Sequence, residues 1–281
     1  MAEAAERRID AHIHFWQLAR GDYTALTPAM PTLLRDHLPV DLAPHLEAHD
    51  IGAIVVVQAA ETVAETRFTL GLGKRWPFIA GVVGWVDPAA PDLAATLDGF
   101  CGDPRYKGVR PVRDDNRSMA WLADPALAPG LAMLAARGLS LDILVQHPDE
   151  LPHATAIAAR HPDLAIVLDH CGKPDIAGGR FRPWADDIAA LARHGNVACK
   201  LSGLLNCARP GAGADDLHPY AAHVLACFGA DRVMWASDWP PLTLAADYGR
   251  WCDVSDTLQA GLSPVDRAAV RGGTAARVYR L

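Results

Sequence analysis

The sequence lacks any apolar run long enough to cross a lipid bilayer. Its longest apolar stretches, Gly52–Val57 and Ile79–Val86, fall far short of the roughly 20 residues that a membrane-spanning helix needs. The segment Met1–Asp10 is charged and has no apolar core of the kind found in secretory signal peptides. The 6 cysteines are scattered without a C-x-x-C pair, which favours reduced thiols over disulfides or a zinc knuckle. These absences predict a cytoplasmic protein that does not act in a membrane.

The sequence also lacks a basic run and any excess of positive charge. It carries 26 Lys and Arg against 33 Asp and Glu, for a net charge of −7, so the basic surface that binds a phosphate backbone is missing. No G-x-G-x-x-G, P-loop or G-x-S-x-G motif is present. We therefore expect a small-molecule partner rather than nucleic acid, and the sequence leaves the oligomeric state open.

What the sequence does contain is a series of short apolar runs, rich in β-branched residues and bounded by Gly, Pro, Asp or Asn. Most are continuously apolar rather than alternating, as a strand buried on both faces requires. The predicted strands are Arg8–Phe15, Ala53–Gln58, Ile79–Val86, Gly108–Val112, Ser140–Gln146, Ala165–His170, Val197–Ser202 and Val233–Ser237.

Segments with Ala and Leu at helical spacing lie between these strands. They predict helices over Asp92–Phe100, Pro125–Arg137, Leu151–Arg160, Trp184–Arg193 and Pro219–Phe228. A unit of about 30 residues that recurs eight times without a low-complexity linker favours a (β/α)8 barrel over an open doubly wound sheet, which usually has fewer strands. We therefore expect an α/β protein in which residues 1–281 form a single barrel domain.

The connection after the first predicted strand is unusually long. Residues 16–50 include several prolines and no clear periodicity. Long irregular connections inside compact domains are often functional, so this segment is a candidate lid over the site.

Polar residues follow the first, sixth and last predicted strands, where a (β/α)8 barrel places its catalytic groups. His12 and His14 are two residues apart on a strand and so point to the same side, where they could hold one metal ion. His170 ends the sixth strand, and Asp238 follows the eighth. An H-x-H pair or a single aspartate is more often structural, but barrel closure makes the first and last strands neighbours. The convergence predicts an active site.

Further residues near the predicted strand ends are candidate substrate contacts. Arg110 and Arg113 could bind a carboxylate or hydroxyl groups, although salt bridges to Asp114 or Asp115 are an equal alternative. Trp16 and Trp239 could offer apolar faces to a sugar ring, or serve only in packing. The other candidate contacts are Gln58, His147, Lys200 and Ser202. The remaining histidines, including His37, are expected at the surface.

Ordered blocks along nearly the whole chain resemble the amidohydrolase superfamily, in the amidohydrolase-2 branch that includes sugar lactonases such as fucono- and rhamnono-lactonases. The blocks that carry the resemblance are Ile9–Trp16, Val55–Ala59, Gly81–Asp87, Lys107–Arg110, Val167–His170, Cys199–Leu204 and Ser237–Pro240.

The resemblance implies a distorted (β/α)8 barrel of the amidohydrolase type that hydrolyses a small sugar lactone, such as L-fucono- or L-rhamnono-lactone. In this scheme Asp238 is the general base and His170 polarises the carbonyl oxygen. His12 and His14, with Asp238, either hold one Zn²⁺ or donate hydrogen bonds in a metal-independent reaction.

Two departures from the superfamily pattern limit the metal site. Metal-dependent members of the superfamily usually have a histidine at the end of the fifth strand, but here that end holds Gln146 and His147, and the register of His147 is not fixed by the sequence. Lys107 lies at the start of the fourth strand, so no lysine is evident at its end to bridge two metal ions. A binuclear centre is therefore not expected. A zinc-dependent decarboxylase or hydratase of an unsaturated carboxylic acid on the same barrel is the alternative, and a catalytically silent sugar-acid binding protein is a third hypothesis.

Overall fold

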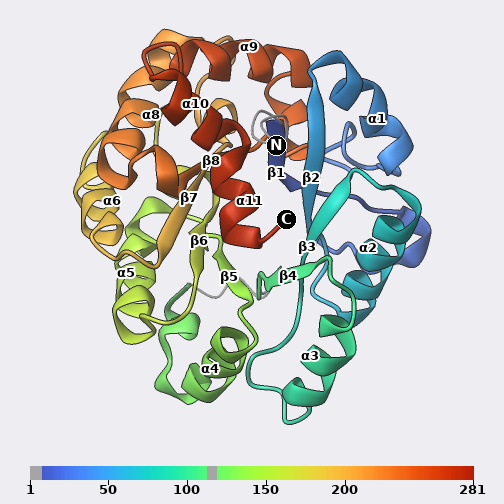
Figure 1. The fold of residues 1–281 in the computed structure, drawn as a ribbon. Helices are drawn as coiled ribbons and strands as arrows, with labels where there is room; N and C mark the ends of the chain where they lie inside the picture. The colour runs from blue at the N-terminus through green and yellow to red at the C-terminus, as the bar shows by residue number, and fades with distance from the viewer. Residues whose placement is uncertain (1–7, 113–118) are drawn as a thin grey trace.

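The protein is a barrel of parallel strands surrounded by helices (Figure 1). The structure is a computed structural model that describes residues 8–112 and 119–281. The strands pair in chain order from the first to the eighth, which confirms the predicted (β/α)8 fold. The strands are β1 (Arg8–Ile13), β2 (Ile51–Val57), β3 (Ile79–Gly84), β4 (Tyr106–Val109), β5 (Ser140–Ile143), β6 (Ile166–Leu168), β7 (Val197–Leu201) and β8 (Val233–Trp235).

The helices alternate with the strands and pack around the barrel. Within the described residues the α-helices are α1 (Pro39–Ala48), α2 (Val63–Arg75), α3 (Leu93–Cys101), α4 (Ala128–Ala136), α5 (Leu151–Arg160), α6 (Trp184–Ala192), α7 (Leu204–Cys207), α8 (Ala214–Phe228), α9 (Tyr248–Leu258), α10 (Pro264–Ala268) and α11 (Thr274–Tyr279). The prediction that α8 begins at Pro219 is wrong, because the helix continues through this proline from Ala214.

Part of the connection predicted to be irregular is helix α1. Its two prolines hid it in the sequence, but Pro39 occupies the first turn, where the ring costs no hydrogen bond. The Asp41 carboxylate accepts a hydrogen bond from the Leu38 backbone N–H at 2.8 Å and so caps the helix start.

Several predicted strands extend too far at their carboxyl ends. The fifth ends at Ile143 rather than Gln146, and the eighth ends at Trp235 rather than Ser237. At these points the chain leaves the ladder and continues into the segments that carry Gln146, His147 and Asp238. Most residues with candidate chemistry therefore follow a strand, whereas His12 lies within β1 and Lys200 within β7.

The barrel closes through residues at the end of β1 and after β8. The backbone N–H of His14 donates to the Trp239 carbonyl at 2.8 Å, and the N–H of Asp238 donates to the His12 carbonyl at 3.0 Å. Ile13 and Trp239 form an isolated parallel bridge at the same place. This seam places two of the predicted site segments side by side.

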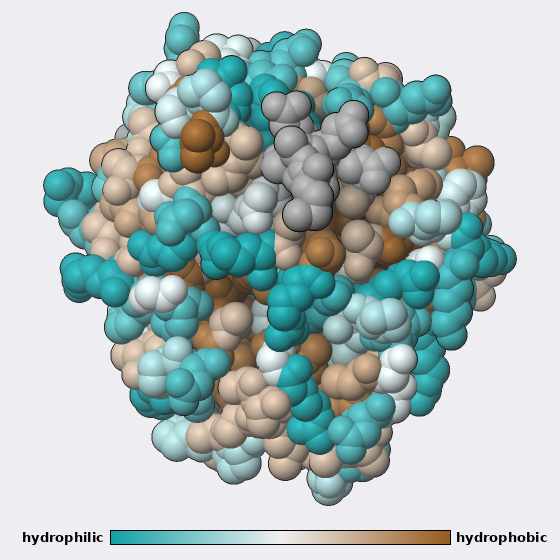
Figure 2. All heavy atoms as spheres, viewed as in Figure 1, coloured by the Kyte–Doolittle hydropathy of each residue, from teal (hydrophilic) through white to brown (hydrophobic). Residues whose placement is uncertain are grey.

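The opposite end of the barrel is covered by the C-terminal helix α11 (Figure 1). Ala275 and Tyr279 belong to a buried cluster with apolar residues of the strands, while a larger cluster joins the strands to the outer helices. On this face hydrophilic residues are interspersed among hydrophobic ones (Figure 2). None of the described helices has the length and apolarity to cross a membrane.

The segment between β1 and α1 is fastened to the barrel by a small buried cluster. Trp16, Tyr23 and Leu33 pack with Ala60. The Tyr23 hydroxyl donates to the Glu65 carboxylate at 2.9 Å, and Glu65 is fully buried. Burial raises the pKa of Glu65 to about 7.

This raised pKa predicts a pH-dependent stability that Glu65→Gln removes. In the unfolded chain Glu65 loses its proton above about pH 4.3, whereas the folded protein retains it up to about pH 7. The stability that Glu65 gives the wild type relative to Glu65→Gln is therefore fully present below about pH 4 and is lost as the pH rises to about 7. The loss amounts to about 4 kcal/mol at most.

Denaturant unfolding of both proteins between pH 4 and 8 measures this difference. The variant Glu47→Gln, at an exposed position of α1, is the control for removal of a carboxylate that is not buried. A difference between wild type and Glu65→Gln that is constant across this range would contradict the prediction.

Candidate active site

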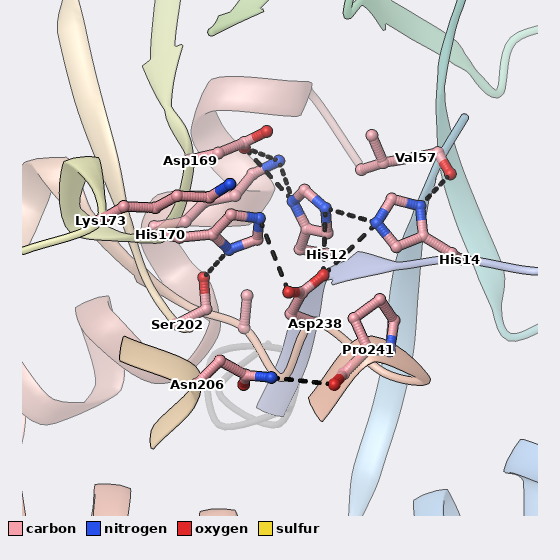
Figure 3. Close-up of polar contacts among 12 residues, drawn as sticks. His12, His14, Val57, Asp169, His170, Lys173, Ser202, Asn206, Asp238 and Pro241 are labelled. Atoms are coloured by element: carbon pink, nitrogen blue, oxygen red, sulfur yellow. Dashed lines mark hydrogen bonds and ion pairs between the residues drawn. The ribbon is translucent and has the colours of Figure 1, made fainter. Parts of the chain in front are cut away.

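Three imidazoles surround one carboxylate at the carboxyl ends of the strands (Figure 3). The Nε2 atoms of His12 and His14 lie 3.0 Å apart. Asp238 Oδ1 lies 3.6 Å from the first and 3.4 Å from the second, and Asp238 Oδ2 lies 3.7 Å from His170 Nε2. The seam between β1 and β8 therefore brings His12, His14 and Asp238 together, and the turn after β6 adds His170.

A buried carboxylate below the seam holds the backbone of these residues in place. Asp10 Oδ1 accepts hydrogen bonds from the N–H groups of Ser237 at 2.9 Å and His12 at 3.2 Å. Its Oδ2 accepts from the Tyr248 hydroxyl at 2.8 Å. Sequence reasoning missed Asp10, although a charged residue inside an apolar strand was a usable signal. The same carboxylate thus fixes the segments of His12 and Asp238.

His170 is positioned by the ends of β6 and β7. Its Nδ1 lies 2.9 Å from the Ser202 hydroxyl oxygen. Gly203 has a φ of +69°, and a Cβ atom there would lie 2.8 Å from the Cβ of His170. Ser202, a predicted substrate contact, is completely buried and contacts His170 instead of facing open space. Its predicted contact with substrate stays a prediction.

Burial sets the charge state of the site. It lowers the pKa of His170 to about 4, against the opposing effect of the Asp238 and Asp169 carboxylates. Burial and the neighbouring Lys200 ammonium hold the pKa of His12 well below its usual value. Burial alone would raise the pKa of Asp238, but the surrounding imidazoles, His170 first, keep it below its usual range. At neutral pH an ionised Asp238 therefore faces neutral His12 and His170.

A second layer of charges lies beneath His12. The Lys200 ammonium contacts Asp142 at 2.6 Å, Asp169 at 3.0 Å and His12 Nδ1 at 3.0 Å. The Tyr279 hydroxyl donates to Asp142 at 2.6 Å. Lys200 is fully enclosed, so the structure places it under His12 rather than at the mouth, where a substrate contact was predicted. Sequence reasoning gave no role to Asp142 or Asp169.

Arg110 also points into the centre of the barrel. Its guanidinium donates to the Gln58 carbonyl at 2.7 Å and lies 3.3 Å from the Asp169 carboxylate. The Gln58 side chain in turn donates to the Arg110 carbonyl at 3.0 Å. Both residues are buried, and the Arg110 guanidinium lies 3.5 Å from His12 Nε2. Arg113, the other predicted arginine, lies outside the described residues.

Buried aromatic side chains pack on one another beside the segment after β1. His37 lies between Trp16 and Trp239, with ring centroids 5.0 Å and 5.3 Å away. The backbones of Trp16 and His37 form an antiparallel bridge. The expectation of a surface position for His37 is wrong, because this bridge draws the side chain under the β1–α1 segment, where it is 1% exposed.

His147 lies outside the histidine cluster. It is exposed, four residues beyond the end of β5 at Ile143, and lines a cleft at the rim together with Gln146 and Lys173. The uncertain register noted in the sequence is thus resolved, since His147 does not join the other imidazoles.

The donor atoms of His12, His14 and Asp238 fit a divalent cation. Tetrahedral zinc with ligand bonds near 2.0–2.1 Å places its ligands about 3.3–3.4 Å apart, close to the three separations given above. His14 Nδ1 lies 2.9 Å from the Val57 carbonyl oxygen, so donation there leaves the Nε2 lone pair facing the centre. Asp238 Oδ1 is buried and accepts no hydrogen bond from any residue that the structure describes, as expected of a ligand atom.

The family model described as amidohydrolase matches residues 9–281. This chain belongs to the amidohydrolase family. An L-fucono-1,5-lactonase of Burkholderia ambifaria is 41% identical over 280 residues, covering 98% of this chain and 96% of that protein. A second L-fucono-1,5-lactonase, from Burkholderia multivorans, is 38% identical over 293 residues, with the same two coverages.

A solved structure of an amidohydrolase has the same fold as this chain. The crystal structure of an amidohydrolase from Burkholderia multivorans with bound zinc superposes with a TM-score of 0.92 at 38% identity. It covers 98% of this chain and 99% of that chain.

The close approach of Gly203 to His170 predicts that Gly203→Ala destabilises the protein. A non-glycine residue in the left-handed region costs about 1–2 kcal/mol, and the new Cβ would push the His170 ring away from Ser202. We expect the free energy of unfolding to fall by about 1–3 kcal/mol, as measured by denaturant unfolding.

Gly99→Ala on α3 is the matched control, because a Cβ at Gly99 would meet nothing within 4 Å. Alanine favours a helix over glycine, so this variant should be unchanged or stabilised by up to about 1 kcal/mol. Equal stability of Gly203→Ala and the wild type would refute the positioning role of Gly203.

Proposed function

We propose that this protein is an enzyme that opens the ester ring of a sugar lactone, with L-fucono-1,5-lactone or a related aldono-lactone such as L-rhamnono-lactone as the substrate. The observation that carries the proposal is the Asp238 carboxylate, enclosed by three imidazoles at the mouth of the barrel. The names of the two Burkholderia relatives support the substrate class.

In the proposed reaction Asp238 is the general base. Its oxygens are directed at the space shared by His12, His14 and His170 (Figure 3), where a water molecule and the lactone carbonyl would meet. Aspartate is a weak base, so its contribution comes from position and from a pKa low enough to keep it ionised. Asp238 accepts a proton as water oxygen bonds to the carbonyl carbon.

His170 is the proposed partner of the carbonyl oxygen. Donation from the Ser202 hydroxyl to Nδ1 leaves the proton of the neutral ring on Nε2, which faces Asp238. This N–H stabilises the negative charge that develops on oxygen in the tetrahedral intermediate. When the bond from carbon to the ring oxygen breaks, Asp238 returns its proton to that oxygen, and the product is the open-chain hydroxy acid.

His12, His14 and Asp238 are the proposed ligands of one zinc ion. When bound there, the metal would act as a Lewis acid on the ester carbonyl. Arg110 and Lys200 place two positive charges next to His12, and the Asp142 and Asp169 carboxylates that pair with them offset these charges.

Replacing the proposed base should abolish lactone hydrolysis with the fold intact. We expect Asp238→Asn to lower kcat by at least about a hundredfold, because the amide cannot accept the proton from water. A pH-indicator assay of acid release from aldono-lactones measures the rate.

Asp253→Asn, an exposed position on α9, is the control and should keep the wild-type rate. No acid release by the wild type from any aldono-lactone would refute the proposed substrate class. An Asp238→Asn rate equal to that of wild type would remove Asp238 from the reaction.

The proposed zinc site predicts a loss of metal affinity on substitution of His14. Chelator-treated wild type should bind one zinc ion in a calorimetric titration, and His14→Ala should bind it at least about tenfold more weakly, because one of three protein ligands is removed. His218→Ala, at an exposed position of α8, should bind like the wild type. Equal affinities of all three proteins would place the metal elsewhere.

A further inference from the structure

The turn after β6 has an unusual backbone conformation next to the site. Four consecutive residues have positive φ, namely His170 at 52°, Cys171 at 53°, Gly172 at 67° and Lys173 at 47°. Non-glycine residues adopt this region only when the surrounding structure enforces it. Here the Trp184 indole donates to the Cys171 carbonyl at 2.8 Å, which secures the turn.

This turn directs Lys173 into the same space as His170. The Lys173 side chain extends alongside the His170 ring toward the centre of the site (Figure 3). Burial lowers the pKa of Lys173, and the Asp238 carboxylate opposes this effect. Lys173 is half-buried. It lies close enough to Asp238 for the carboxylate to favour the charged ammonium.

Lys173 has no counterion within the described part of the chain. Its ammonium makes one hydrogen bond, to the Gln146 side-chain oxygen at 3.0 Å, although it has three donors. The neighbouring basic residues differ, since Arg180 pairs with Asp175 at 2.5 Å and Arg182 pairs with Asp186 at 2.5 Å. Lys173 therefore retains donors for a ligand.

Lys173 and Gln146 line a cleft outside the histidine cluster. Its volume is about 620 Å³, more than a single lactone ring needs. Its lining includes the polar side chains of Gln146, His147 and Arg182 as well as prolines and Trp184. Lys173 thus borders both the proposed reaction centre and a cleft of mixed polar and apolar lining that can accept the parts of a substrate beyond the ester.

A sugar lactone differs from a simple lactone in its hydroxyl groups. An ammonium donates to hydroxyl oxygens, and the Gln146 amide both donates and accepts. We propose that Lys173 and Gln146 form a specificity subsite that binds the hydroxyl groups of the lactone ring or its side arm. This inference rests on the proposed function and names the residues that select a hydroxylated substrate.

Two lactones separate binding of hydroxyl groups from action on the ester. Kinetics of the wild type, Lys173→Met and Lys173→Arg are measured with L-fucono-1,5-lactone and with unsubstituted δ-valerolactone. Where turnover of the latter is slow, its inhibition constant replaces kcat/KM. Lys173→Met should lose about 10- to 100-fold in kcat/KM on the sugar lactone, mainly through KM. Its value for δ-valerolactone should change less than about threefold, and Lys173→Arg should restore part of the loss.

Lys74→Met on the exposed face of α2 removes the same charge far from the site and should have no effect. Gln146→Ala, at an exposed loop position, gives a second test should Lys173→Met fold poorly, and should show a smaller loss with the same dependence on hydroxyl groups.

Equal losses on both lactones would overturn the inference, because Lys173 would then act on the ester. Unchanged kinetics on the sugar lactone would overturn it as well, while leaving the proposed function intact. Failure of the wild type to hydrolyse any lactone would overturn the proposed function and this inference with it.

Discussion

The site depends on the hydrogen bonds that close the barrel between β1 and β8. They are made by the backbones of His12, His14, Asp238 and Trp239, so barrel closure and assembly of the site are one event. Asp10 reinforces the seam from below. A change that opens the seam would therefore separate the imidazoles from the carboxylate before it disturbed the rest of the barrel.

Charge is arranged in layers along the barrel axis. Tyr279 of the C-terminal helix α11 contacts Asp142, Asp142 contacts Lys200, and Lys200 contacts His12. Each group is buried, and a buried charge is tolerated only when it is paired and hydrogen-bonded. The C-terminal helix at one end of the barrel is in this way connected to the imidazoles at the other.

Backbone strain is concentrated at the mouth. His170, Cys171, Lys173 and Asp238 all have positive φ, and the packing around them, including Gly203 against His170, enforces these conformations. Such strain costs stability and persists where the surrounding structure fixes it. Here it turns the side chains of His170 and Asp238 toward each other and away from the strands that precede them.

The sequence by itself determined the barrel, because continuous apolar runs and helical spacing are local properties. It also determined that His12 and His14 share a side, and that Asp238 follows the last strand, next to the first. Only the tertiary structure decided the contacts of Lys200, which joins residues 58 and 188 positions away, and the burial of His37. Such contacts depend on how distant segments pack, and no local pattern of residues specifies that.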